Sequence, residues 1–84
     1  GVMPVKSYLV FPKDGQKEPL TVELNDLDWC EATPAENKDV LVLVTDTTNE
    51  KEEENCLNQL NNIQSIKHYT LVSGFEENQN NSPL

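Results

Sequence analysis

The sequence has no arginine, and its six lysines face fifteen aspartates and glutamates, which leaves a formal net charge of −9. A chain with so few cations repels phosphate groups, so we expect no nucleic-acid partner and little affinity for an anionic membrane surface. A basic partner is the better electrostatic match. The shortage of positive charge therefore argues against the phosphate-binding classes of protein and favours a cationic ligand.

Long hydrophobic runs are also missing. No apolar stretch approaches the roughly 18–20 residues that cross a bilayer. Residues 1–6 have neither the basic start nor the apolar core of a secretory signal, and Gly1 is interpreted as a residue left by expression. We therefore expect a cytoplasmic protein that does not insert into membranes.

Residue types that build catalytic and metal sites are scarce. There is one histidine, His68, and the two cysteines, Cys30 and Cys56, are too far apart for a metal-binding motif. No phosphate-binding, zinc-binding or nucleophile motif occurs, and the acidic run 50–54 is interpreted as a solvated helix start. We expect no enzyme activity, no catalytic or metal-binding residue and no cofactor. The thiols are expected to be reduced, with a single disulfide as the alternative.

Apolar periodicity and breaker residues predict six elements in the order β-α-β-β-α-β. Residues 5–11 are rich in β-branched and aromatic residues and end at Pro12, before the turn signal Asp14-Gly15. A one-sided helix is predicted from Pro19 to Leu27, followed by a weak edge strand over 29–33.

The second half of the chain begins with its clearest strand, VLVLV at 40–44, which is apolar on both alternating faces. The next segment predicts a helix that is capped by Thr47 or Asn49. Its buried stripe consists of Cys56, Leu57, Leu60 and Ile63, and Asn61-Asn62 ends it. Residues 66–75 form the last predicted strand.

This order predicts an α+β domain of the ferredoxin-like type over residues 5–75, after a short segment 1–4. Right-handed crossovers give a four-stranded antiparallel sheet with both helices on one face and the first and third strands in its centre. The polar tail 76–84 is expected to be disordered.

Because both helices cover one face, the other face of the sheet should present an apolar patch to a partner. The alternative is an ordinary half-covered sheet, or a dimer that uses this face. Strand alternation assigns each side chain to a face, and a one-residue slip would exchange the faces of the last strand. The predicted open face carries Ser7, Leu9, Phe11, Leu41, Leu43, Thr45, His68, Thr70 and Val72. The predicted covered face carries Tyr8, Val10, Val40, Val42, Val44, Tyr69 and Leu71.

Several segments resemble the NapD family, whose members are small cytoplasmic maturation chaperones of the periplasmic nitrate reductase. They are DVLVLVTD at 39–46, the acidic helix after it, IQSI at 63–66 and TLV at 70–72. Ser7 in the first strand and WCEA at 29–32 match further family positions. The likeness covers residues 5–75, and the chain looks like a divergent member of this family.

The resemblance implies a chaperone without catalytic activity. Family members bind the twin-arginine (Tat) signal peptide of the catalytic subunit, or of a related molybdoenzyme, and delay export until the cofactor is inserted. The nine residues of the predicted open face would then contact the peptide's apolar segment, and nearby carboxylates its arginines. A monomer is expected, with a weak dimer as the alternative.

Two hypotheses from other functional classes stay open. One is a regulatory module of the same fold that binds a small molecule at a dimer interface. The other is a small structural subunit whose open sheet face seals against a larger protein. Gel filtration separates the first from a chaperone, because a sensing module should be a stable dimer and a chaperone mainly a monomer.

Overall fold

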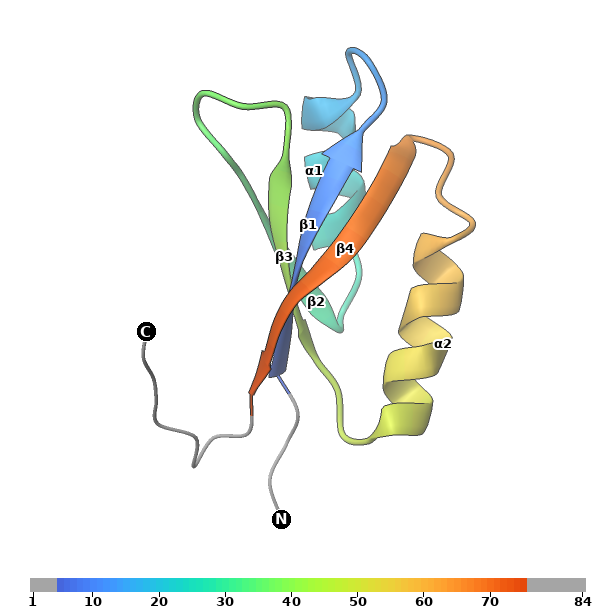
Figure 1. Ribbon diagram of the computed structural model, residues 1–84. Helices are drawn as coiled ribbons and strands as arrows, with labels where there is room; N and C mark the ends of the chain where they lie inside the picture. Colours follow the sequence, from blue (N-terminus) through green and yellow to red (C-terminus); the bar gives the residue numbers. More distant parts are fainter. Residues whose placement is uncertain (1–4, 76–84) are drawn as a thin grey trace.

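The structure, a computed structural model, describes residues 5–75, and for residues 73–75 it describes the backbone alone (Figure 1). Six elements occur in the predicted order, so the ferredoxin-like α+β fold is confirmed. Residues 1–4 and the predicted disordered tail 76–84 lie outside the described residues. The elements are β1 (Val5–Pro12), α1 (Lys17–Asn25), β2 (Cys30–Pro34), β3 (Leu41–Asp46), α2 (Glu50–Leu60) and β4 (Ile66–Phe75).

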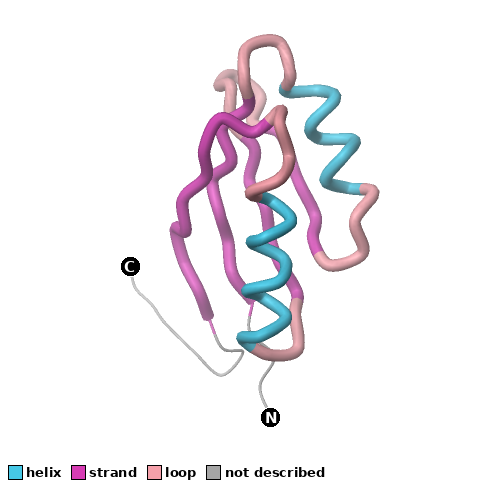
Figure 2. Tube along the Cα trace, turned by 90° about the vertical axis from the view of Figure 1, so that its right-hand side faces the viewer, coloured by secondary structure: helices cyan, strands magenta, loops and turns pink. Residues whose placement is uncertain are grey.

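The four strands form one antiparallel sheet in the order β2-β3-β1-β4. The first and third strands are therefore central, as predicted. Both helices lie on the same side of this sheet (Figure 2). One face of the sheet is thus covered, and none of the described residues forms a second layer over the other.

The core lies between the helices and the covered face. Leucines of α1 and α2 pack there on alternate residues of the central strands. The burial of these apolar side chains supplies most of the free energy that favours folding. The members of this cluster are Tyr8, Val10, Leu20, Leu24, Ala32, Leu41, Leu43, Leu60 and Ile66.

Local sequence explains where the helices begin. Gly15 forms the turn after β1 with a φ of 77°, a left-handed conformation that glycine adopts without strain. Helix α1 starts two residues before Pro19, which sits in the first turn. Helix α2 is capped by Asn49, whose side chain accepts a hydrogen bond from the Glu52 amide at 2.8 Å. Of the two predicted caps, Asn49 is therefore the one used.

Neither helix in the described part of the chain combines the length and the apolar character that crossing a membrane requires.

Candidate functional site

The alternation of side chains along the two central strands determines which residues face away from the helices. In β1 the prediction is correct: Tyr8 and Val10 are buried, while Ser7, Leu9 and Phe11 lie on the open face. In β3 it is wrong. The three residues predicted for its open face, Leu41, Leu43 and Thr45, are each 0% exposed and face the helices.

The register between β1 and β3 gives the physical reason for this correction. Leu43 lies opposite the buried Tyr8, whereas Val42 lies opposite Leu9. Val42 and Val44, predicted for the covered face, therefore belong to the open face, and Val42 is 39% exposed. Val40 precedes the strand and is buried. Because leucine is larger than valine, this phase buries more apolar surface.

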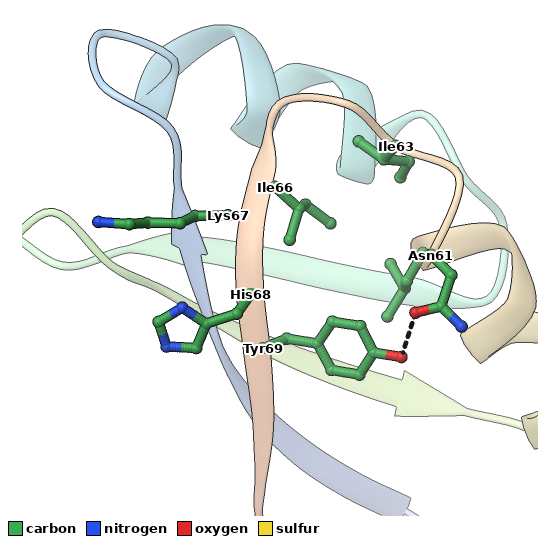
Figure 3. A pocket seen from close by; sticks show the side chains of 7 residues that line it. Asn61, Ile63, Ile66, Lys67, His68 and Tyr69 are labelled. Carbon is green, nitrogen blue, oxygen red and sulfur yellow. Dashed lines mark hydrogen bonds between the residues drawn. The ribbon is translucent and has the colours of Figure 1, made fainter.

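Strand β4 contributes His68 and Thr70 to the open face, where they lie opposite Phe11 and Leu9. Ile66 and Tyr69 point to the helix side, and the Tyr69 hydroxyl donates a hydrogen bond to Asn61 Oδ1 at 2.8 Å (Figure 3).

The end of β4 departs from simple alternation. Val72 lies at an irregularity of the ladder, because Tyr8 pairs with Leu71 and Ser7 pairs with Ser73. Leu71 follows the covered-face phase predicted for it, yet it is 54% exposed, as is Val72.

The open face thus carries a band of apolar side chains, which we call the open-face patch. It extends over both central strands and reaches β4, where the Phe11 ring stacks on His68 with 4.4 Å between ring centroids and 20° between planes. The patch consists of Val5, Leu9, Phe11, Val42 and Val44, with Ser7, His68 and Thr70 between or beside them.

The two ends of the open-face patch differ in charge. At the Val5 end lies an acidic pocket of about 320 Å³ with three carboxylates, lined by Val5, Asp28, Trp29, Cys30, Glu31, Val44 and Asp46. At the Phe11 end stand His68 and Lys67, which point to the same side of β4 in Figure 3. A ligand on the patch therefore meets a pocket lined by carboxylates at the Val5 end and the cation of Lys67 at the Phe11 end.

Backbone and side-chain contacts hold the acidic pocket in shape. The Asp46 amide donates to the Trp29 carbonyl at 2.9 Å, which joins the end of β3 to the segment before β2. Trp29 is partly buried against the core. Cys30 Sγ donates to the Leu24 carbonyl at 3.4 Å, and burial, followed by the nearby Cys56, raises the Cys30 pKa to about 11. The thiol is therefore neutral at pH 7, and the negative charge comes from the carboxylates.

A second pocket, here called the edge pocket, lies between the end of α2 and β4 and has a volume of about 300 Å³ (Figure 3). Its side chains are apolar or polar without charge, apart from Lys67 and the imidazole of His68. They are Leu60, Asn61, Ile63, Ile66, Lys67, His68 and Tyr69.

Sequence reasoning missed a carboxylate in the core. Glu53 lies in the acidic run predicted to be solvated, but it is 3% exposed. Its carboxylate accepts hydrogen bonds from the hydroxyls of Tyr8, Thr45 and Thr47, the last at 3.0 Å. Burial, and then the hydrogen bond and charge of Glu53, raise the pKa of Tyr8. Helical spacing to Cys56 and Leu60 was the available signal, because all three share one face of α2.

This Glu53 cluster is closed from solvent and joins α2 to β1 and β3, so its arrangement fits a structural role. The described residues include no group of three or more histidine, cysteine, aspartate or glutamate side chains placed to hold a metal ion. Cys30 and Cys56 are both free thiols.

No model of a known protein family matches the chain, and no curated protein matches its sequence at a significant level.

Proposed function

We propose that this protein is a NapD-like cytoplasmic chaperone without catalytic activity. It binds the twin-arginine signal peptide of a periplasmic nitrate reductase, or of a related molybdoenzyme, on its open sheet face and delays export until the cofactor is inserted. The observation that carries the proposal is the open-face patch with an acidic pocket at its Val5 end. The family resemblance of residues 5–75 supplies the identity of the peptide.

The apolar segment of such a peptide suits the open-face patch. Leu9 and Val42 lie side by side on the central strands, and Phe11 and Val44 extend the patch in both directions. Burial of these partly exposed side chains stabilises a complex at roughly 25 cal/mol per Å² of apolar area removed from water. This burial supplies affinity without requiring a particular peptide sequence.

The arginines of the peptide suit the acidic pocket. A guanidinium pairs with carboxylates in a two-pronged geometry and stacks on an indole ring. Asp28, Glu31 and Asp46 provide the carboxylates, and Trp29 provides the ring. Lysine offers neither the planar fork nor the same stacking, so a pocket of this composition favours arginine.

These two matches favour one direction for the bound peptide. In a twin-arginine signal the arginines precede the apolar segment. The peptide therefore runs from the acidic pocket across Leu9 and Val42 towards Phe11 and His68. The positive Lys67 at that far end disfavours the reverse orientation.

Calorimetric titration with a synthetic twin-arginine signal peptide tests the proposal, with a twin-lysine peptide as the first control. We expect micromolar or tighter affinity, weaker binding of the lysine peptide, and weaker binding in added salt. The variant Asp28→Asn/Glu31→Gln/Asp46→Asn should lose the preference for arginine.

The matched control for that variant is Glu18→Gln/Asp39→Asn/Glu54→Gln. It removes the same charge at exposed positions outside the acidic pocket and should keep the preference. A flat titration with the folded wild-type protein, or equal losses in the two triple variants, would contradict the proposal.

A further inference from the structure

The two edge strands of the sheet differ in whether their outward backbone groups are hydrogen-bonded. At the β2 edge, the Asn25 side chain imitates a neighbouring strand: its amide donates to the Ala32 carbonyl at 2.9 Å, and its oxygen accepts from the Ala32 amide at 2.8 Å. At the β4 edge, β1 is the only strand among residues 5–75 that pairs with this ten-residue strand. An uncovered edge strand is a template for another strand.

The charge of the chain favours the β4 edge as a place where a second copy can approach. All fifteen acidic residues lie outside residues 55–75, which include the end of α2, the edge pocket and β4. Each copy carries a net charge of −9, so a contact between surfaces without carboxylates is opposed least by charge repulsion. The β4 edge carries one lysine, Lys67, and no carboxylate.

We propose that a second copy of this chain binds at the β4 edge, with the two β4 strands antiparallel about a two-fold axis at Thr70. This inference goes beyond the proposed function and does not depend on it. A two-fold contact requires a self-complementary surface, in which each residue meets its counterpart in the other copy.

The sequence of β4 meets this requirement around Thr70. The axis places the two Thr70 side chains opposite each other on the open face, a favourable cross-strand pair. Tyr69 of each copy then lies opposite Leu71 of the other on the helix side. The pairing covers Leu71, which is 54% exposed in one copy, and places it beside Tyr69, one wall of the edge pocket (Figure 3).

The contact is small, so the dimer is weak. The β1–β4 ladder has register shifts on either side of residues 68–71, which leaves a short regular stretch for pairing. A single strand pair buries far less than the about 1,600 Å² of a stable complex. The acidic pocket lies at the other end of the sheet order, beside β2 and β3, and stays accessible in both copies.

Sedimentation velocity from about 5 to about 500 µM tests the dimer, because association depends on concentration. We expect a monomer at the low end and a growing dimer fraction at the high end. Added salt should increase the dimer fraction, since it screens repulsion between two strongly acidic copies. Amide NMR shifts that change with concentration should be confined to the edge pocket and β4.

Two pairs of variants locate the contact. Thr70→Lys places like charges at the axis and should weaken dimerisation at least about tenfold, while Thr33→Lys makes the same change on the same face at the β2 edge and should leave it unchanged. Leu71→Lys should act like Thr70→Lys, and its control is Val22→Lys on α1, where the valine is 69% exposed. All four positions are exposed, so the variants keep the core intact.

A protein that stays monomeric at every concentration and salt overturns the proposal. So does a dimer that survives both β4 variants, or one that Thr33→Lys weakens equally. None of these results bears on signal-peptide binding, which the calorimetric titration measures separately.

Discussion

The covered and open faces of the sheet are built from alternate residues of the same two strands, yet they differ in burial and in where their charges lie. On the covered face even the polar side chains are satisfied, as the Glu53 cluster illustrates. On the open face Val42 is 39% exposed, and charge gathers at the two ends. One position along β3 separates the two environments.

This difference explains how so short a chain can fold and still expose apolar side chains on one face of its sheet. A domain of this size has a modest core and a small margin of stability. Leu41, Leu43 and Thr45 serve the core, so Val42 and Val44 can remain accessible at little cost. Neighbouring residues of β3 should therefore respond very differently to the same substitution.

The largest expected effect comes from placing a charge on each face in turn. Leu43→Asp buries a carboxylate at a position that is 0% exposed and should cost more than about 4 kcal/mol, enough to unfold the domain. Val42→Asp, one residue earlier, should cost less than about 1 kcal/mol. Urea denaturation followed by circular dichroism measures both. Similar losses in the two variants would mean that the faces are assigned wrongly.

Removal of the buried carboxylate should have the next largest effect. Glu53→Ala leaves the hydroxyls of Tyr8, Thr45 and Thr47 without their acceptor and should cost about 3 kcal/mol. The matched control is Glu54→Ala, an exposed neighbour on the same helix, which should stay within about 0.5 kcal/mol of the wild type. Denaturant midpoints compare the two, and equal midpoints would remove the structural role given to the Glu53 cluster.

Substitutions on the open face should weaken peptide binding and leave the stability of the fold nearly unchanged. Val42→Asp/Val44→Asp should weaken the twin-arginine peptide at least about tenfold, or about 1.4 kcal/mol, while the unfolding midpoint changes little. Its control, Val22→Asp/Gln59→Asp, adds the same charge at exposed helix positions and should bind with only a small electrostatic loss. Full affinity in the β3 variant would show that the peptide does not use the open-face patch.

The smallest expected effect is a loss of stability in alkali. Burial raises the Cys30 pKa from 9.0 to about 11, so the folded state holds this proton more tightly than the unfolded state. The stabilisation is complete below pH 9 and is lost as the pH rises from about 9 to about 11. Urea midpoints across this range should fall for the wild type and fall less steeply for Cys30→Ala. The raised pKa of Tyr8 lowers stability in alkali in the same direction. If the urea midpoints of the wild type and of Cys30→Ala fell equally steeply with pH, the Cys30 thiol would not be buried as described.

Local signals were enough to predict the fold. Pro12 ends the first strand, Gly15 turns the chain, and a one-sided apolar pattern marks the first helix, so these elements can be identified without their neighbours. Right-handed crossovers then leave few arrangements for six elements in this order. The central positions of β1 and β3 follow from the same rule.

The phase of β3 could not be predicted in this way. VLVLV is apolar at both odd and even positions, so alternation carries no information about its faces. The choice arises only when Leu43 meets Tyr8 across the sheet. The Glu53 cluster has the same origin, because its hydroxyls come from strands distant in sequence. Asp28, Glu31 and Asp46 likewise converge on the acidic pocket only in the folded chain.

We propose above that one face of this sheet binds a twin-arginine signal peptide with its arginines at the acidic end. An NMR titration of the labelled protein with a peptide that carries a spin label beside the arginines tests it most directly. We expect amide signal loss around Trp29, Glu31 and Asp46, and shift changes at Leu9 and Val42 without signal loss at Phe11 and His68. Signal loss at the His68 end, or changes confined to the helices, would contradict it.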